Sequence, residues 1–343
     1  MERANLDWQN LGFGLTPTDV NLRYWFKNGR WSEAEVTAST DVSIPMAATA
    51  LHYGQALFEG LKAFETKDGR TVIFRPRENA IRMARGAKKL LMEPPPMELF
   101  LEGITEAVRR NQRFLAPYGS NASLYIRPLL VGTGARVGVR PADEYLFLIF
   151  VTPVGPYYTS GLKPIRLWIE EEVNRAAPHG VGDIKAAGNY AAGMRATARA
   201  MELGYQGVLY LDSREQRWVD ECGAANFYAI KHGDRSATYV TPRSASILES
   251  ITNASLQTVA RDLGMAVEYR PMEAAELPSF EEAGVCDTAS VITPVGAMRW
   301  GARDLTYWDG GKSAGPYTEK LYDRLTGIQT GRVEDTHGWL YPV

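Results

Sequence analysis

The chain has 343 residues, 45% of them hydrophobic, which is enough apolar material for a sizeable core and for two domains. A formal net charge of −2 argues against nucleic-acid and anionic-membrane partners, and two cysteines, Cys222 and Cys286, are too few for a disulfide framework. The sequence shows no leader-like opening and no apolar run near the ~20 residues of a membrane span, so we expect a cytoplasmic protein that acts on small molecules.

The first part of the chain is predicted to combine short strands with two helices. An apolar run at 22–26 ends at Asn28-Gly29, a dipeptide typical of a hairpin turn. Arg75-Pro76 begins a helix that must end before Pro94-Pro95-Pro96, and a second amphipathic helix follows. The predicted elements are a strand at 71–74, helices at 75–91 and 97–114, and strands at 123–131 and 145–152.

Several side chains in this part have two interpretations. Tyr53 and Phe58 lie in a glycine-interrupted aromatic stretch, either as core residues or as the lining of a pocket. Arg77, Arg82 and Arg85 share the first helix, and the sequence by itself does not choose among them. Tyr125 and Arg127 are two apart on a strand and so share one face, where an arginine needs an anion.

The segment 132–138 superficially resembles a dinucleotide fingerprint, but its glycine spacing is wrong and a strand follows it, so we interpret it as a flexible loop. A stretch rich in proline and glycine begins at Pro153 and is the best domain boundary in the chain. The predicted domains are 1–153 and 164–343, joined by a connector at 154–163.

The second part opens with a strand at 165–170 and then reaches Lys185, which lies among small residues just before an amphipathic helix at 190–203. Lys185 is either an ordinary surface lysine or an amine placed for a Schiff base, for which pyridoxal phosphate is the commonest aldehyde. Further predicted elements are strands at 207–211, 217–220, 226–231 and 237–240 in an antiparallel meander, a helix at 252–263, a strand at 286–291 with a polar insert at 287–290, and a terminal helix at 315–327.

A pyridoxal phosphate site also needs a carboxylate for the pyridine nitrogen, a cation or helix N-terminus for the phosphate, and a donor for the ring hydroxyl. Glu221 lies among small residues after a strand, either as a solvated strand-end glutamate or as that carboxylate. The N-terminus of the helix at 252–263, with hydroxyls nearby, could hold a phosphate. Tyr190 follows the lysine by five residues. The histidines are scattered, so no metal site is expected.

Three motifs in this order resemble those of branched-chain amino acid aminotransferases: Lys185-Ala-Ala-Gly-Asn189-Tyr190, Glu221-x-Gly223-x-x-Asn226 and Leu248-x-x-Ile251-Thr252. The resemblance extends over nearly the whole chain, from Phe13-Gly14 through Phe58-Glu59-Gly60 and Tyr125-Ile126-Arg127-Pro128 to Gly327-Ile328-Gln329-Thr330-Gly331-Arg332. It implies an α+β, fold-type IV pyridoxal phosphate enzyme with a smaller α/β N-terminal domain, a larger pseudo-barrel C-terminal domain, and a homodimer with shared active sites.

The resemblance also implies site residues and an activity. Lys185 would attach the cofactor and act as the base, Glu221 would hold the pyridine nitrogen, Tyr190 the ring hydroxyl and Arg82 the phosphate. The other implied cofactor contacts are Leu248, Ile251, Thr252 and Thr288. The implied substrate contacts are Phe13, Tyr53, Phe58, Tyr125, Arg127, Tyr157 and Ala289, with Val137 and Val139 lent by the partner subunit. The reaction implied is ping-pong transfer of an amino group between leucine, isoleucine or valine and 2-oxoglutarate, that of a branched-chain-amino-acid transaminase.

Four residues depart from the family motifs: Glu249, Ser250, Asn253 and Asp287. Asp287 and Glu249 motivate an alternative, a fold-type IV aminotransferase with altered substrate preference that serves secondary metabolism. D-amino-acid aminotransferases share this fold type and are another alternative. A 4-amino-4-deoxychorismate lyase is a further alternative, and a non-catalytic binding protein of this fold would have no reason to keep Lys185. A Cys-x-x-Cys pair of certain relatives is replaced by Ser290 and Thr293, which argues against thiol regulation of that kind.

Overall fold

The computed structural model describes residues 2–155 and 162–343, and these form two compact units. The first contains the described residues of Met1–Thr159 together with Ile184–Gly188 and Gly327–Val343, and the second contains the described residues of Ser160–Asp183 and Asn189–Thr326. Lys185 and the C-terminal segment therefore belong to the first unit. The predicted boundaries at 1–153, 154–163 and 164–343 stay a prediction, since most of the connector lies outside the described residues.

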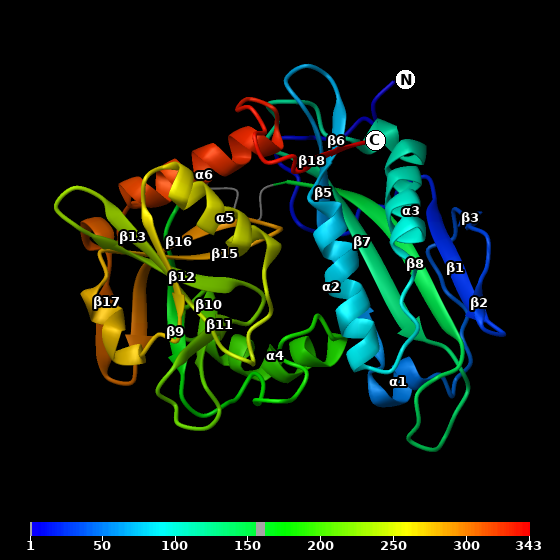
Figure 1. Ribbon diagram of the computed structural model, residues 1–343, viewed down its shortest axis with the longest axis horizontal. Helices are drawn as coiled ribbons and strands as arrows, with labels where there is room; N and C mark the ends of the chain where they lie inside the picture. The colour runs from blue at the N-terminus through cyan, green and yellow to red at the C-terminus, as the bar shows by residue number, and fades with distance from the viewer. Residues whose placement is uncertain (1, 156–161) are drawn as a thin grey trace. The chain divides into compact units, whose positions relative to one another are not determined.

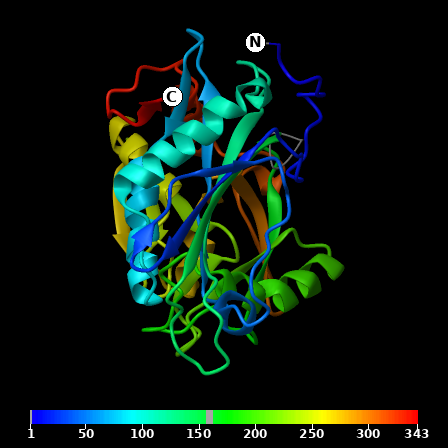
Figure 2. The same cartoon turned by 90° about the vertical axis from the view of Figure 1, so that its right-hand side faces the viewer.

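The first unit is a largely antiparallel sheet with two helices on one face, α2 and α3, which pack against each other beside β7 and β8 (Figures 1 and 2). The sheet order is β18-β6-β5-β7-β8-β1-β2, with β3 paired to β1 and β4 to β7. Its elements are β1 (Asn21–Lys27), β2 (Arg30–Trp31), β3 (Glu35–Thr37), α1 (Thr49–Tyr53), β4 (Ala56–Phe58), β5 (Leu61–Glu65), β6 (Thr71–Phe74), α2 (Pro76–Lys89), α3 (Met97–Arg110), a 3₁₀ turn (Gln112–Phe114), β7 (Ser123–Gly132), β8 (Tyr145–Val154) and β18 (Leu340–Pro342).

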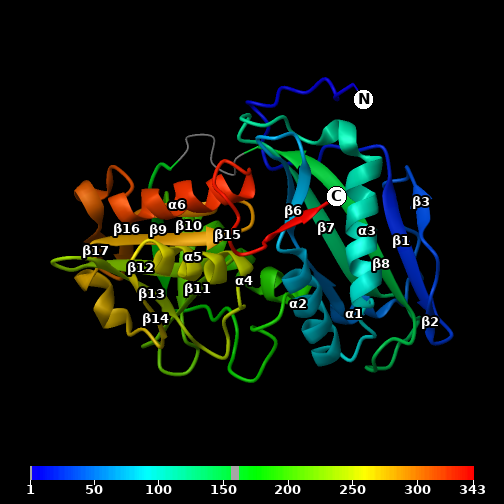
Figure 3. The ribbon, with the colours of Figure 1, turned by 45° about the horizontal axis from the view of Figure 1, so that its top comes forward.

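Local sequence signals explain much of this unit. The predicted hairpin is confirmed, because Lys27 pairs with Arg30 across Asn28 and Gly29, whose φ angles of 52° and 75° are those of the turn that suits twisted strands. Helix α2 begins with Pro76 at its first position, where a missing N–H costs nothing. The last strand, β18, is added at the sheet edge beside β6 and lies next to it in Figure 3.

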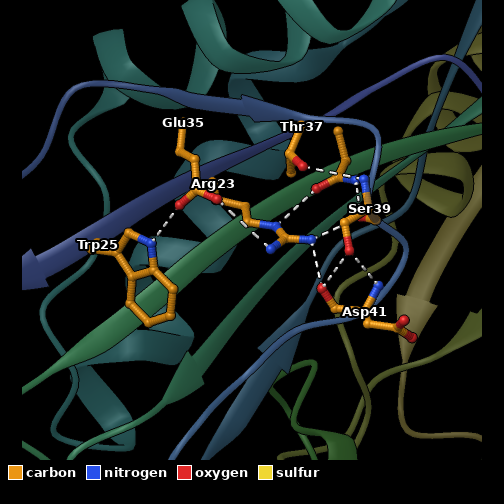
Figure 4. Close-up of polar contacts among 7 residues, drawn as sticks. Arg23, Trp25, Glu35, Thr37, Ser39 and Asp41 are labelled. Atoms are coloured by element: carbon orange, nitrogen blue, oxygen red, sulfur yellow. Dashed lines mark hydrogen bonds and ion pairs between the residues drawn. The ribbon is translucent and has the colours of Figure 1, made fainter.

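A buried arginine anchors the segment that precedes α1 (Figure 4). Arg23 on β1 is 7% exposed and donates to the carbonyls of Ser39 and Asp41, each at 2.8 Å, and to Asn21 Oδ1 at 3.0 Å. Glu35 accepts from the Trp25 indole at 3.1 Å and lies 3.8 Å from the Arg23 guanidinium. The guanidinium thus satisfies backbone carbonyls of a segment that has little regular structure of its own.

The second unit is a mixed sheet in the order β11-β10-β9-β16-β15-β12-β13-β14, with β17 paired to β16. Its elements are β9 (Ile165–Glu170), α4 (Ala187–Glu202), β10 (Gly207–Leu211), β11 (Val219–Cys222), β12 (Asn226–His232), β13 (Ala237–Pro242), α5 (Ile251–Asp262), β14 (Ala266–Arg270), a 3₁₀ helix (Ala274–Ser279), β15 (Glu282–Asp287), β16 (Val291–Trp300), β17 (Arg303–Thr306), a second 3₁₀ segment (Trp308–Gly311) and α6 (Pro316–Gln329). The first residues of α4 and the last residues of α6 belong to the first unit.

Two predictions about this sheet are wrong. The strands from β10 to β13 do not form a continuous meander, because β11 and β12 are not neighbours in the sheet: an isolated bridge joins Cys222 to Ala225, and β12 lies between β13 and β15. The predicted strand at 286–291 is a hairpin: β15 ends at Asp287, a turn follows, and β16 begins at Val291. An apolar run around a short polar stretch fits either a single strand or a tight turn, and only the pairing decides.

Both cysteines are buried, Cys222 at 5% exposure and Cys286 at 0%. Burial is the main cause that raises the pKa of each thiol, and neighbouring carboxylates add to it. Because the thiolate is the reactive form, we expect neither cysteine of the native protein to react with a thiol reagent on the timescale of free cysteine. The measurement is a titration with a thiol reagent, which should count two thiols after the protein is unfolded. Rapid labelling of the native protein would contradict this prediction.

Among the described residues, none of the helices combines the length and apolarity that membrane crossing requires. Nor do three His, Cys, Asp or Glu side chains gather there in a way that could hold a metal ion.

Candidate active site

Lys185 is held by its backbone in the first unit. Its neighbours Ile184 and Ala186 are buried in the core, and its carbonyl accepts a hydrogen bond from Phe58 N at 3.2 Å, next to a bridge between Leu57 and Ala186. The side chain therefore points away from the core, and its Nζ lies 4.8 Å from the centre of the Phe58 ring. An ammonium over a ring face is attracted by the ring quadrupole, so Lys185 is positioned rather than loose.

Phe58 also contacts a second cation. The Arg127 guanidinium lies 4.8 Å from the Phe58 ring and 5.3 Å from that of Tyr125, and it donates to Tyr125 Oη at 3.2 Å. Phe13 packs edge-on against Tyr125 at 5.1 Å. The expected shared face of Tyr125 and Arg127 is confirmed. In the described part of the chain Arg127 has no ion-pair partner, and its charge rests on aromatic rings.

The structure distinguishes the three arginines of α2. Arg77 and Arg85 are exposed, whereas Arg82 is on the buried face and 9% exposed. Its Nε and Nη2 donate to the two oxygens of Glu59 at 2.8 and 2.7 Å, and Asn79 donates to the same carboxylate at 2.8 Å. Glu59 is fully buried. This two-point pair fixes the plane of the guanidinium.

The loop after β7 carries the remaining predicted residues of this unit. It is tied to the segment around α1, since Arg136 N donates to Ala47 O at 2.8 Å and Tyr53 Oη donates to the carbonyl of Val137. We expected a flexible loop, whereas these hydrogen bonds attach it to the segment around α1. Tyr53 is 39% exposed and is not a core residue, while Val137 and Val139 are each 83% exposed.

In the second unit, Glu221 lies at the end of β11 and is only 5% exposed, so it is not a solvated strand-end glutamate. Its Oε1 is 3.0 Å from Arg175 Nη1, and its Oε2 accepts from Asn226 Nδ2 at 3.0 Å. Asn226 also donates to the carbonyl of Leu248 at 2.9 Å. A buried carboxylate is thus held at both oxygens.

The segment at 248–253 leads into α5. Ser250 is the N-cap of this helix, and its hydroxyl accepts from Asn253 N at 3.1 Å. Leu248 and Thr252 are buried, and Ile251 is half-buried. The backbone N–H groups of the first turn have no acceptor within the helix, which makes this end suited to an anion.

Besides Ser250, two further departures from the family motifs have structural roles. Asn253 is buried and its amide accepts from Tyr239 Oη at 2.8 Å and donates to Thr241 Oγ1 at 2.9 Å. The Asp287 carboxylate accepts from the N–H of Ser290 at 2.6 Å and from its hydroxyl at 3.1 Å, which closes the hairpin turn. The half-buried residues Thr288 and Ala289 lie on that turn, and Glu249 is exposed.

Tyr190 lies in the first turn of α4 and is half-buried, and the neighbouring Asn189 donates to Val181 O at 2.7 Å. The helix begins at Ala187, three residues earlier than predicted. Tyr157 lies outside the described residues.

Three polar residues in contact with these groups were given no role by sequence reasoning: Glu59, Arg175 and Asn226. Glu59 and Asn226 lie inside the quoted motifs, and a charged residue between Phe58 and Gly60 was the available signal for the first. Arg175 lies in an irregular segment after β9, where neither periodicity nor spacing marks it.

The family model for amino-transferase class IV matches residues 56–298 of the chain. Branched-chain-amino-acid aminotransferases of Helicobacter pylori and Haemophilus influenzae are 42% and 43% identical to it, each over 99% of this chain and over 98% and 99% of their own lengths. The crystal structure of the Escherichia coli branched-chain amino acid aminotransferase aligns with a TM-score of 0.78 at 27% identity, covering 93% of this chain and 98% of that one.

The fold and these matches define a class IV aminotransferase, so the predicted α+β, fold-type IV class is confirmed. Within that class, the chain belongs to the branched-chain-amino-acid aminotransferase family.

Proposed function

We propose that this protein transfers the amino group between branched-chain L-amino acids and 2-oxoglutarate with pyridoxal phosphate as cofactor. The observation that carries the proposal is similarity over 99% of the chain to enzymes named for this reaction, in a chain that has Lys185 at the motif position. The reaction class follows from an amine that can bind an aldehyde and a carboxylate that can pair with a pyridinium.

The donor set fits the cofactor. Lys185 offers the amine, Glu221 a buried carboxylate for the ring nitrogen, Tyr190 a hydroxyl, and Arg82 a cation for the phosphate. Leu248 supplies an apolar face. Ile251 and Thr252 supply first-turn N–H groups of α5, and Thr288 supplies a hydroxyl. When bound, pyridoxal phosphate supplies an electron sink that acidifies the α-proton of the amino acid. Lys185 Nζ would then accept that proton and pass it to the cofactor side of the nitrogen, because returning it to the α-carbon would regenerate the amino acid.

Substrate recognition has to combine apolar walls with one cation. Phe13, Phe58 and Tyr125 provide aromatic surface, and Arg127, supported on two of those rings, is suited to the distal carboxylate of glutamate. A carboxylate that meets Arg127 adds a partner for a cation that has no ion pair among the described residues. Tyr53, Ala289 and Tyr157 complete the substrate contacts that we propose.

We further propose that the protein is a homodimer in which Val137 and Val139 contribute to the partner's site. Both valines are 83% exposed, and nearby Met46 and Leu51 are exposed at 91% and 63%, which is an unusual apolar surface to leave in water. The molar mass in solution tests this, and a monomer at assay concentration would contradict it. Cytoplasmic location remains part of the proposal.

The experiment for the function is a panel of half-reactions. The purified protein, loaded with pyridoxal phosphate, is mixed in turn with L-leucine, L-isoleucine, L-valine, L-glutamate, an aromatic amino acid and D-alanine, and conversion of the cofactor to its amine form is followed by absorbance. We expect rapid conversion by the branched-chain amino acids and by glutamate. Conversion by another amine with none by the branched-chain amino acids would leave the family membership intact and overturn the substrate proposal.

A further inference from the structure

Arg175 is a buried cation outside every motif that the proposed function uses. Its side chain is 4% exposed, and it lies in the irregular segment between β9 and Lys185. Besides the ion pair between its Nη1 and Glu221 Oε1 at 3.0 Å, its Nη2 donates to the carbonyls of Ser246 and, at 3.4 Å, of Gly182. One guanidinium therefore joins three separate stretches of the second unit.

Asn226, like Arg175, binds both Glu221 and a backbone carbonyl. Asn226 Nδ2 donates to Glu221 Oε2 and to the carbonyl of Leu248, at 3.0 and 2.9 Å. The two donors thus bind the two oxygens of one carboxylate, and each also binds a carbonyl of the 246–248 segment. We call this arrangement of Arg175, Asn226 and Glu221 the carboxylate clamp. Because 246–248 leads into α5, the clamp connects the glutamate to the start of that helix.

The backbone around Arg175 is shaped for this contact. A Cβ at Gly182 would lie 2.5 Å from Ser246 O and 3.1 Å from Arg175 Nη2, so a side chain there would compete with the hydrogen bonds of the guanidinium. The neighbouring Asp220 is also buried, and burial raises the pKa of its carboxyl group, against the opposing effects of Ser244 and Arg175. Glu221 thus shares a poorly solvated environment in which an ionised carboxylate needs a cation.

We infer that Arg175 is a positioning residue for the proposed reaction: it holds Glu221 ionised and oriented for the pyridine nitrogen, and links it to the segment before α5. The inference rests on the proposed function. The guanidinium touches neither substrate nor cofactor in this role, so its effect is transmitted through the protonation of the cofactor nitrogen and through cofactor affinity. A neutral side chain of similar length would lose both effects, whereas lysine would keep the charge and lose the bridge.

The test compares Arg175→Met and Arg175→Lys with Arg217→Met, the control. Arg217 is also an arginine of the second unit paired with a glutamate, Glu273, but its side chain is 54% exposed. Each protein is titrated with pyridoxal phosphate to obtain a dissociation constant, and the ¹⁵N resonance of cofactor labelled at the pyridine nitrogen is recorded in the holoenzyme.

We expect Arg175→Met to weaken cofactor binding about ten-fold or more, and to shift the ¹⁵N resonance toward the unprotonated form. Arg175→Lys should keep the resonance near that of the parent protein and still bind the cofactor more weakly, and Arg217→Met should match the parent in both measurements. If Arg175→Met does not fold, Arg175→Lys decides, since parent-like affinity in that variant would overturn the bridging role.

An unchanged resonance and affinity in a folded Arg175→Met variant would also overturn the inference. Such a result is distinguishable from failure of the proposed function, in which the parent protein itself would not take up pyridoxal phosphate or convert any amino acid.

Discussion

Replacing Lys185 by alanine is expected to reduce transamination by about four orders of magnitude or more, because it removes both the amine that binds the cofactor and the base that moves the α-proton. The variant should fold. The Lys185 carbonyl accepts from Phe58 N, Ala186 bridges to Leu57, and Ile184 and Ala186 pack in the core. These contacts do not need the lysine side chain, and the substitution removes the contact of Nζ with the Phe58 ring.

The measurement is kcat for leucine and 2-oxoglutarate, with circular dichroism to verify folding. Lys88→Ala is the matched control, since Lys88 is an exposed lysine of α2 and its loss should leave the rate unchanged. A Lys185→Ala protein that transaminates at the parent rate would refute the assignment of this lysine.

Replacing Glu59 by alanine is expected to have the largest effect on stability, a loss of about 3–5 kcal/mol in the free energy of unfolding. The carboxylate is fully buried and accepts from Arg82 at two points and from Asn79, so its removal takes two hydrogen bonds from a buried guanidinium and one from a buried amide. Cofactor affinity should also fall, because Arg82 would no longer be held in one plane.

Glu106→Ala is the control for this variant. Glu106 and Arg110 make an ion pair at the same 2.7 Å distance as Glu59 and Arg82, but on the exposed face of α3, where such a pair contributes only about 0.3–0.5 kcal/mol. Denaturant unfolding of the two variants and the parent protein compares them. Equal destabilisation by the two substitutions would show that burial does not determine the strength of the Glu59 pair.

Local chemistry made part of the fold predictable. The strands at 71–74, 165–170 and 207–211 have the bounds that were expected, and the Asn28-Gly29 turn has the expected structure. Such features are formed by a few adjacent residues, so a local sequence pattern is sufficient to predict them.

Predictions of features that depend on residues far apart in the chain were wrong, or were not made. The hairpin at 287–291 was expected as one strand, because the closing contact of Asp287 with Ser290 is a choice among several that a polar stretch allows. β12 pairs with the next strand, β13, as expected, but its other neighbour, β15, lies about fifty residues or more along the chain, a pairing that no local pattern records.

The proposed site residues likewise include some that the sequence predicted and some that only the structure revealed. The sequence by itself led to the prediction that Lys185, Tyr190, Glu221 and Arg82 carry the chemistry, since a motif is a statement about residue types and spacing. Only the tertiary structure decided that Arg82 is the buried arginine of α2, and that Arg82 pairs with Glu59 and Glu221 with Arg175. A buried charge must find its partner wherever the fold brings one, and that partner can lie at any distance along the chain.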